Sequence, residues 1–273
     1  MTKLSDEEVY RDKGFVLLKG FFSQEKMDEI RNDAKKIFVS QMVRLGLVAS
    51  TPLNEIAFEA SMVDLFQKDL QSFTNCGKQA QHLISLHRLC LDQRITERLS
   101  GFGLEFPNIS TRPVLYFNSE RLAKKEVYWR LSAHQDWRSM QGSLDSIVVW
   151  VPLMDISKTL GALEVIPGSH KRGLQDATII DGYGKMQGTI DESDFIPLEI
   201  EKGDALFFST FLVHRSGTNA TNSIRWSCHF RYNNLRESTF IERGYPHPYI
   251  YKPQEELITP GFPTLKQMKK IFS

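Results

Sequence analysis

The sequence has few cysteines, no long hydrophobic segment and almost no net charge. Its three cysteines, Cys76, Cys90 and Cys228, lack Cys-x-x-Cys spacing, so neither a disulfide framework nor a zinc knuckle is expected. No apolar run approaches the roughly 20 residues of a membrane helix, and the polar start MTKLSDEEVYRDKG lacks the apolar core of a signal peptide. A formal net charge of +1 disfavours nucleic acid or a membrane surface as partner. We therefore expect a cytoplasmic protein with neither of those partners.

The pattern of apolar residues changes near residue 100. Before it, apolar residues recur at helical spacing; after Gly101, short strand-like runs alternate with turns. Many short strands preceded by helices predict a mainly β fold, a jelly-roll (double-stranded β-helix) core with N-terminal helical additions. We expect a single domain over residues 1–273. It would comprise a helical part at about 1–100, the jelly-roll core at about 101–235 and a C-terminal extension at 236–273.

Three local predictions concern the second half of the chain. Residues 171–194, with four glycines and weak periodicity, suit a long mobile loop, and such loops are often active-site lids. Residues 196–200 and 205–208, joined by the turn 201–204, predict a hairpin. The tail from 237 is rich in proline and aromatics and then helical near 265–272.

The segment Leu131–Trp137 (LSAHQDW) contains a His-x-Asp pair in a strand-like context. Residues i and i+2 of a strand face the same side, so His134 and Asp136 could reach one point in space. An imidazole and a carboxylate are two thirds of the 2-His-1-carboxylate triad that holds non-haem Fe(II). A second histidine on another predicted strand, His214, would complete it. His82 and His87 have no ligand at metal spacing and are expected to be structural or surface histidines.

The predicted strand 224–232 alternates cleanly. Its apolar residues share one face, and the opposite face carries Arg225, Ser227, His229 and Arg231. That face could be solvated or could line a polar interior. We favour the interior, because the strand follows the His214 segment and a planar guanidinium is the natural partner of a carboxylate.

Together these residues resemble the phytanoyl-CoA dioxygenase family, a branch of the Fe(II)/2-oxoglutarate-dependent oxygenases. The resemblance covers roughly residues 5–235 and has no match in the tail. It rests on a set of motifs in this order: Gly14-Phe15-Val16, Phe21-Phe22-Ser23, His134-x-Asp136, Trp150, Pro167-Gly168-Ser169-His170, Gly203-Asp204, His214-x-Ser216, Asn219, Arg225 and Arg231-Tyr232.

The resemblance implies an enzyme with iron held by His134, Asp136 and His214. It also implies that Arg225 pairs with the distal carboxylate of 2-oxoglutarate, with Ser216 as a second contact. Trp150 would flank the cosubstrate or, equally, be a large core residue. Such enzymes consume O2, convert 2-oxoglutarate to succinate and hydroxylate an unactivated C–H bond. Because related halogenases lack the carboxylate ligand, Asp136 favours hydroxylation or another oxidation such as desaturation.

The substrate is less defined than the reaction. Arginines and aromatic residues expected around the metal suit an anionic or polar small molecule, although several could simply face solvent. These candidates are Arg112, Tyr116, Asn118, Trp129, Arg130, Trp137, Arg138 and Arg231. Two alternatives stay open: a jelly-roll metalloenzyme of non-oxidative chemistry, which would not need Arg225, and a catalytically inactive ligand-binding homologue. The sequence does not indicate an oligomeric state.

Overall fold

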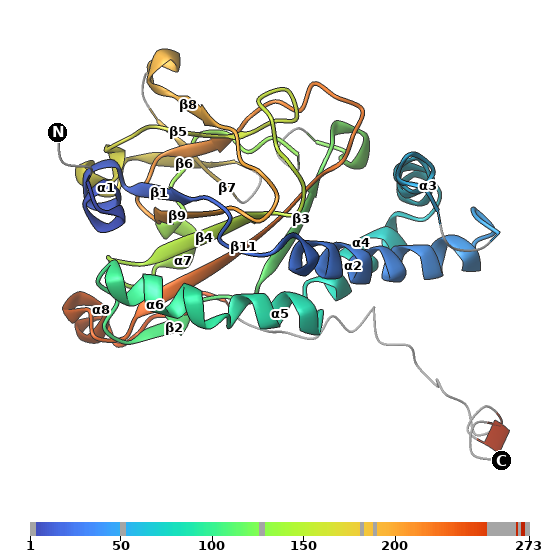
Figure 1. Cartoon of the computed structure of the whole chain (residues 1–273), viewed down its shortest axis with the longest axis horizontal. Helices are drawn as coiled ribbons and strands as arrows, with labels where there is room; N and C mark the ends of the chain where they lie inside the picture. The colour runs from blue at the N-terminus through green and yellow to red at the C-terminus, as the bar shows by residue number, and fades with distance from the viewer. Residues whose placement is uncertain are drawn as a thin grey trace.

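The computed structural model describes residues 4–49, 53–125, 129–180, 183–187, 190–249, 266 and 269–270. In these ranges most of the helices precede the main strands, as the sequence predicts (Figure 1). The α-helices are α1 (Asp6–Lys13), α2 (Gln24–Arg44), α3 (Glu55–Lys68), α4 (Leu70–Ala80), α5 (Ile84–Cys90), α6 (Gln93–Gly101), α7 (Trp137–Met140) and α8 (Ser238–Glu242). Short 3-10 turns are η1 (Glu120–Leu122), η3 (Ser169–Arg172) and η4 (Glu192–Asp194).

The strands form two main sheets and one hairpin, with antiparallel pairing throughout the registers described. The large sheet has the order β1-β9-β4-β11-β2, and β3 also pairs with β11; the small sheet is β10-β5-β8; β6 and β7 pair with each other. The strands are β1 (Phe15–Leu18), β2 (Pro107–Ile109), β3 (Val114–Asn118), β4 (Ile147–Pro152), β5 (Leu163–Val165), β6 (Ala177–Ile180), β7 (Tyr183–Met186), β8 (Ile196–Leu198), β9 (Ala205–Ser209), β10 (His214–Ser216) and β11 (Arg225–Asn234).

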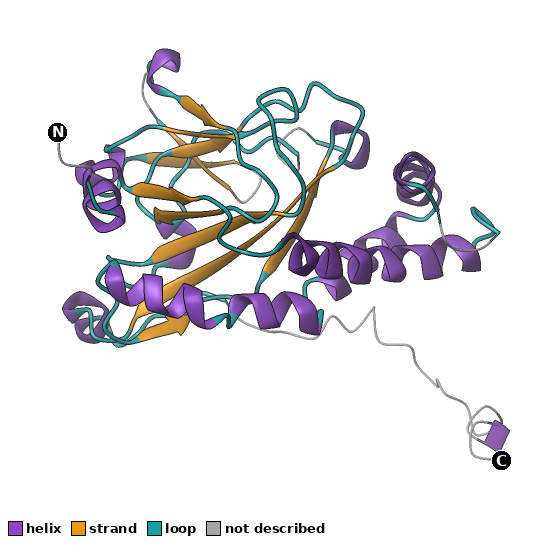
Figure 2. Ribbon diagram, viewed as in Figure 1, coloured by secondary structure: helices purple, strands orange, loops and turns teal. Residues whose placement is uncertain are grey.

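Two apolar cores lie on the two faces of the large sheet. The outer face packs against helices α2–α6, and its buried residues include Val149, Phe207 and Trp226. The inner face packs toward the small sheet, with Val148, Trp150 and Phe208 among its buried residues. Figure 2 shows the strands above a helical layer formed by α2, α5 and α6. This architecture confirms the predicted β-rich jelly roll with N-terminal helices.

The N-terminal segment contributes directly to the large sheet. Helix α1 begins at a capping box in which Ser5 and Glu8 bond each other's backbone N–H groups, and it ends at Gly14, whose φ of +79° favours glycine. The chain then enters β1, whose Phe15 pairs with Phe208 of β9. The sheet therefore includes one strand from the part of the chain predicted to be helical.

Two local predictions are wrong. Residues 196–200 and 205–208 do not form a hairpin, because β8 pairs with β5 in the small sheet whereas β9 pairs with β1 and β4 in the large one. The turn 201–204 therefore joins the two sheets. Residues 171–194 are not an unstructured loop in their described part, because they include the β6–β7 hairpin, which bonds to the His134 segment through Met186 N–H and Ala133 O.

Most of the predicted C-terminal helix lies outside the described residues, although 266, 269 and 270 are helical. Among the helices that the structure describes, none is long and apolar enough to cross a membrane.

Candidate metal centre

Three side chains predicted from the sequence to be metal ligands lie together. One ligand atom from each of His134, Asp136 and His214 lies within 4.8 Å of the others. Asp136 Oδ1 is 3.6 Å from Nε2 of His134 and 3.9 Å from Nε2 of His214. The ring centroids of the two histidines are 4.2 Å apart. Two nitrogens and one oxygen therefore converge.

The backbone that brings them together differs in part from the prediction. His134 and His214 form an antiparallel bridge, with the N–H of each bonded to the carbonyl of the other. Asp136, however, is not on a strand: its φ and ψ are −64° and −31°, and it is the residue that precedes α7. The expectation that His134 and Asp136 share a strand face is wrong. Convergence arises because the chain turns from an extended segment into a helix between them.

Hydrogen bonds fix the orientation of both imidazoles. His134 Nδ1 lies 2.7 Å from Ser132 O and His214 Nδ1 lies 3.0 Å from Leu212 O. A carbonyl oxygen only accepts, so each Nδ1 carries the proton in the neutral ring, and Nε2 keeps a free lone pair toward the cluster. Burial, followed by the neighbouring His134, lowers the pKa of His214 to about 4. That ring is therefore neutral at pH 7 and suited to bind a metal.

Asp136 has a cationic partner. Arg231 donates a hydrogen bond from Nε to Asp136 Oδ2 at 2.9 Å, and its Nη2 lies in ion-pair contact with the same oxygen, also at 2.9 Å. Burial opposes ionisation of Asp136, but the Arg231 guanidinium and the two imidazoles outweigh it, so the pKa of this carboxyl is well below its usual range. The sequence predicts Arg231 as a substrate contact, but in the structure its side chain is bonded to Asp136, one of the three candidate metal ligands.

Strand β11 has the two faces that its sequence predicts. Trp226, Cys228 and Phe230 belong to the core under the helices. The opposite residues, Arg225, Ser227, His229 and Arg231, face the space between the sheets, since β11 register pairs His229 with the inward-facing Trp150. The polar-interior interpretation is confirmed, and the solvated alternative is excluded by the burial of Arg225 and Ser227.

Arg225 is a buried cation with few partners. It is 2% exposed and donates one hydrogen bond to Gly161 O. Its Nε and Ser227 Oγ are buried without a hydrogen-bond partner among the described residues. Burial lowers the pKa of Arg225 to about 10, and buried polar groups normally have partners. This part of the lining is therefore prepared for an anion.

The other two predicted cosubstrate contacts are also buried. Ser216 shares the face of β10 that carries His214 and is 6% exposed. Trp150 pairs with His229 in β11 and with Leu206 in β9, inside the apolar core between the sheets. Ser227 was missed, although its place two residues after Arg225 on the polar face was visible in the alternation.

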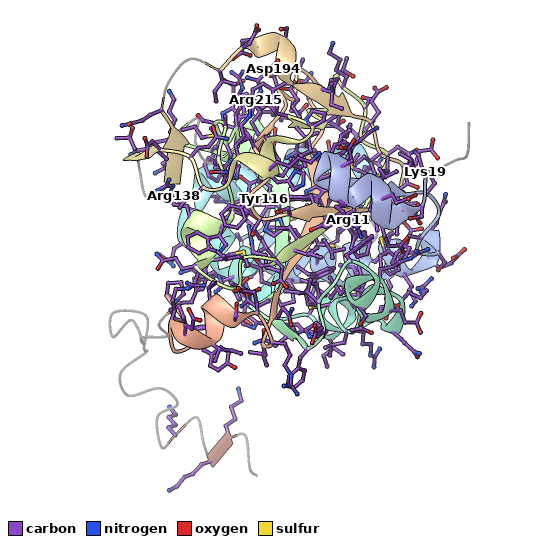
Figure 3. The ribbon with its side chains drawn as sticks, turned by 90° about the vertical axis from the view of Figure 1, so that its left-hand side faces the viewer. Arg11, Lys19, Tyr116, Arg138, Asp194 and Arg215 are labelled. Carbon is purple, nitrogen blue, oxygen red and sulfur yellow. The ribbon has the colours of Figure 1, made fainter. Side chains whose placement is uncertain are left out.

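The predicted substrate residues separate into two groups. Tyr116 and Asn118 of β3 pair with Ser227 and Arg225 of β11, which places them on the inner face. Three others have different partners: exposed Arg112 bonds Gln81, which follows α4, Trp137 stacks on Phe211 at 5.4 Å, and Arg138 bonds Gln175 O. Asn118 also donates to Trp129 O. Figure 3 shows Tyr116 near the centre and Arg138 at the left of one side of the molecule. The structure does not bring all of these residues together.

His170 of the Pro-Gly-Ser-His turn contacts the N-terminal helix. Its Nε2 lies 3.2 Å from Arg11 O, and a Cβ on Gly14 would come within 2.3 Å of its ring. The neighbouring Lys171 bonds Asp12 at 2.6 Å. This turn therefore fastens α1 and β1 to the small-sheet side.

Gln135, between two of the candidate ligands, was also missed. Its amide donates to Gly173 O and Phe211 O and accepts from Gln175 N–H. These bonds tie the 173–175 segment to the ligand turn. A lone glutamine between two ligands carries no sequence signal for this role.

The residues fit a bound divalent metal. Two atoms about 2.1 Å from one ion are at most about 4.2 Å apart, and the carboxylate–imidazole separations of 3.6 and 3.9 Å satisfy that limit. Two imidazoles and one carboxylate are the donor set of non-haem Fe(II) oxygenases. A buried arginine in the same lining, whose Nε has no hydrogen-bond partner among the residues described, agrees with an anionic second ligand.

A jelly roll with such a donor set defines a class of metal-dependent oxygenases. The sequence model of the phytanoyl-CoA dioxygenase family matches residues 10–227. The chain belongs to the phytanoyl-CoA dioxygenase family. The match confirms the family expected from the motifs and, with it, the expected dioxygenase class.

Individual relatives agree. The human peroxisomal phytanoyl-CoA dioxygenase is 26% identical over 242 residues, covering 83% of this chain and 68% of that protein. Phytanoyl-CoA dioxygenase 1 of Oryza sativa subsp. japonica is 27% identical over 241 residues, covering 79% and 84%. Among solved structures, the epimerase SnoN in complex with Fe3+, alpha ketoglutarate and nogalamycin RO has a TM-score of 0.57 at 18% identity, covering 84% and 82%. That structural likeness supports the fold.

Proposed function

We propose that the protein is a non-haem Fe(II)/2-oxoglutarate-dependent dioxygenase that hydroxylates, or otherwise oxidises, an unactivated C–H bond of a small-molecule metabolite and releases succinate and CO2. One observation carries the proposal. The His134–Asp136–His214 cluster and a buried Arg225, whose Nε has no hydrogen-bond partner in the described part of the chain, belong to the same inter-sheet lining.

His134, Asp136 and His214 would hold the iron. When bound, Fe(II), 2-oxoglutarate and O2 supply the oxidising chemistry, and succinate and CO2 leave as products. The protein's own task is to orient the ligands and exclude water. The Nδ1 bonds to backbone carbonyls already orient both imidazoles, and the low pKa of Asp136 keeps the carboxylate ionised without a metal.

Arg225 would bind the distal carboxylate of 2-oxoglutarate. A guanidinium forms paired hydrogen bonds with a carboxylate, and the orphaned Nε is available for one of them. Ser227 Oγ, on the same strand face, is a second donor without a partner among the described residues. Ser216 remains the alternative second contact, and Trp150 would flank the cosubstrate. Loss of affinity in Ser227→Ala but not in Ser216→Ala would identify Ser227 as the contact.

The substrate is proposed to be an anionic or polar small molecule. Of the predicted substrate residues, Tyr116 and Asn118 lie on the inner face, as does Arg231, which is bound to Asp136. The names of the relatives describe the substrates of those proteins. The polar residues of the inter-sheet lining in this chain do not indicate a substrate with a long acyl chain. The cytoplasmic location stays a prediction.

Two other functions are weaker. A non-oxidative metalloenzyme could use the same three ligands, but it would give no reason to bury, in the same lining, a guanidinium whose Nε lacks a partner in the described part of the chain, which costs stability. An inactive homologue would have no need of the complete cluster, the oriented imidazoles and Arg225 together.

The decisive experiment is anaerobic absorption spectroscopy of metal-free protein. Fe(II) is added first and 2-oxoglutarate second, with each alone as a control. A weak visible charge-transfer band that requires both additions is expected, because chelation of the keto acid at iron produces it. Metabolites are then screened for faster succinate release in air.

The alternatives give different results. Metal binding without the band would contradict the proposal and favour the non-oxidative enzyme. A band without accelerated turnover by any metabolite, together with slow uncoupled succinate release, would leave the cofactors established and the substrate to be found.

A further inference from the structure

The two oxygens of Asp136 have different partners. Oδ2 accepts a hydrogen bond from Nε of Arg231 at 2.9 Å and is in ion-pair contact with its Nη2 at 2.9 Å. Oδ1 instead faces Nε2 of His134 at 3.6 Å and of His214 at 3.9 Å. One oxygen is thus held by a cation and the other is directed into the cluster.

We propose that Arg231 is a positioning residue that makes Asp136 a one-oxygen metal ligand and, through its charge, weakens that carboxylate as an electron donor. The inference rests on the proposed iron site and goes beyond its ligand set. Arg231 lies on a strand and makes no described hydrogen bond to either predicted histidine ligand. The inference gives it a role in tuning the metal.

The local backbone does not explain the orientation of Asp136. A carboxylate at the start of a helix normally accepts from the first free N–H groups of that helix. Asp136 precedes α7 but makes no such side-chain hydrogen bond. Its side chain is turned instead toward Arg231 and the histidines, so the orientation comes from β11, across the inter-sheet space.

Burial makes the charge of Arg231 effective. The side chains of Arg231 and Asp136 are 15% and 7% exposed, and charges interact more strongly where water is largely excluded. Among the described residues, the Arg231 side chain has hydrogen bonds only to Asp136. A donor that binds the unused oxygen of a ligand orients it and changes its basicity.

A purely structural latch between β11 and the α7 turn is the competing interpretation. Such a latch would change stability when broken, but it would not change the electronic spectrum of a metal at the site. Two substitutions separate the two properties of Arg231. Arg231→Lys keeps the positive charge and loses the planar guanidinium with its Nε donor, whereas Arg231→Gln keeps a donor and loses the charge.

Arg31→Gln is the matched control. The Arg31 side chain is also 15% exposed and pairs with a carboxylate, Glu55, at 2.5 Å, but it lies in the helical layer. Arg31→Gln therefore removes the same charge and an ion pair without touching the cluster.

The first measurement is Mn(II) binding by titration calorimetry without 2-oxoglutarate. We expect Arg231→Lys to bind Mn(II) about 10-fold more weakly than wild type, the lower end of the usual effect of losing a partner of a metal ligand, and Arg31→Gln to bind normally. Equal affinity of wild type and Arg231→Lys would overturn the orienting role.

The second measurement is the anaerobic Fe(II)–2-oxoglutarate band. In Arg231→Gln the band should move to longer wavelength, because a more electron-rich carboxylate raises the iron d orbitals; Arg231→Lys and Arg31→Gln should keep the wild-type position. An unshifted band in Arg231→Gln would overturn the charge role. No band in wild type would instead refute the proposed function, and the Mn(II) titration would still decide the orienting role.

Discussion

Replacing Arg225 by methionine should stabilise the ligand-free protein while weakening its binding of 2-oxoglutarate. Arg225 is 2% exposed, and burial lowers its pKa well below the usual value, to about 10. A cation whose pKa is depressed on folding destabilises the fold at every pH below the folded value. At 1.36 kcal/mol per pKa unit the cost is roughly 3 kcal/mol, and apolar replacements of buried charges often recover such energy.

The effect on the cosubstrate has the opposite sign. Hydrogen bonds to charged groups contribute about 1.5–3 kcal/mol, which corresponds to a roughly 10- to 150-fold increase in the dissociation constant of 2-oxoglutarate. The substitution should thus raise the free energy of unfolding by about 1–3 kcal/mol without ligand. Saturating 2-oxoglutarate and Mn(II) should stabilise it less than they stabilise wild type.

Urea unfolding at pH 7.5 measures the first effect, and calorimetric titration of 2-oxoglutarate into the Mn(II) protein measures the second. Arg31→Gln again controls for the general loss of a guanidinium. The reasoning would be refuted by a variant that is destabilised and binds 2-oxoglutarate normally, since Arg225 would then be an ordinary structural residue.

Three further predictions concern other parts of the molecule. His214→Ala should abolish the thermal stabilisation by Mn(II), which for one site at 100 times its dissociation constant is about 2.7 kcal/mol; a retained shift would mean that the metal binds elsewhere. Gly217→Ala should destabilise the protein in urea by about 1–3 kcal/mol, since its Cβ would lie 2.2 Å from Ala162 O; unchanged stability would argue against this close approach. Asp92→Asn should cost about 1 kcal/mol, because it removes the ion pairs with Arg94 and Lys26, and hydrogen bonds led by Arg94 lower the pKa of Asp92. The difference in free energy of unfolding between wild type and variant should be complete above pH about 4. It should shrink as the pH falls toward the lowered pKa of Asp92 in the folded protein; a difference independent of pH would be evidence against the ion pair.

Controls for these variants are available in the same chain. His87→Ala removes a half-buried histidine that lies on α5, and it should leave the Mn(II) effect intact. Gly101 is the last residue of α6, and the nearest atom to a Cβ added there would be 3.4 Å away. Gly101→Ala should therefore change the free energy of unfolding only slightly.

Structural features that follow from a short sequence pattern could be predicted from the sequence. The polar face of β11 was predictable, because alternation with a period of two is visible in any window of the chain. The two histidines and Asp136 were predictable as a set from their types and motif, although not from the correct backbone. A His-x-Asp pair on a strand and one that spans the start of a helix have the same letters, and only the fold distinguishes them.

Pairing between distant segments was not predictable. The hairpin assigned to 196–208 had suitable strands and a suitable turn, but each strand finds better partners in a different sheet. The Arg231–Asp136 pair joins residues 95 positions apart. Its energy depends on a shared buried space that no local pattern describes.

The edge position of β1 has a consequence for synthesis of the chain. Phe15 must pair with Phe208, so the first strand leaves the ribosome long before its partner exists. Until then its four residues stay unpaired beside a growing helical segment. Such distant pairing slows folding and prolongs aggregation-prone intermediates. We expect removal of the first 18 residues to yield protein that aggregates during expression, because Phe208, whose ring lies 4.9 Å from that of His214, would be left on an open edge.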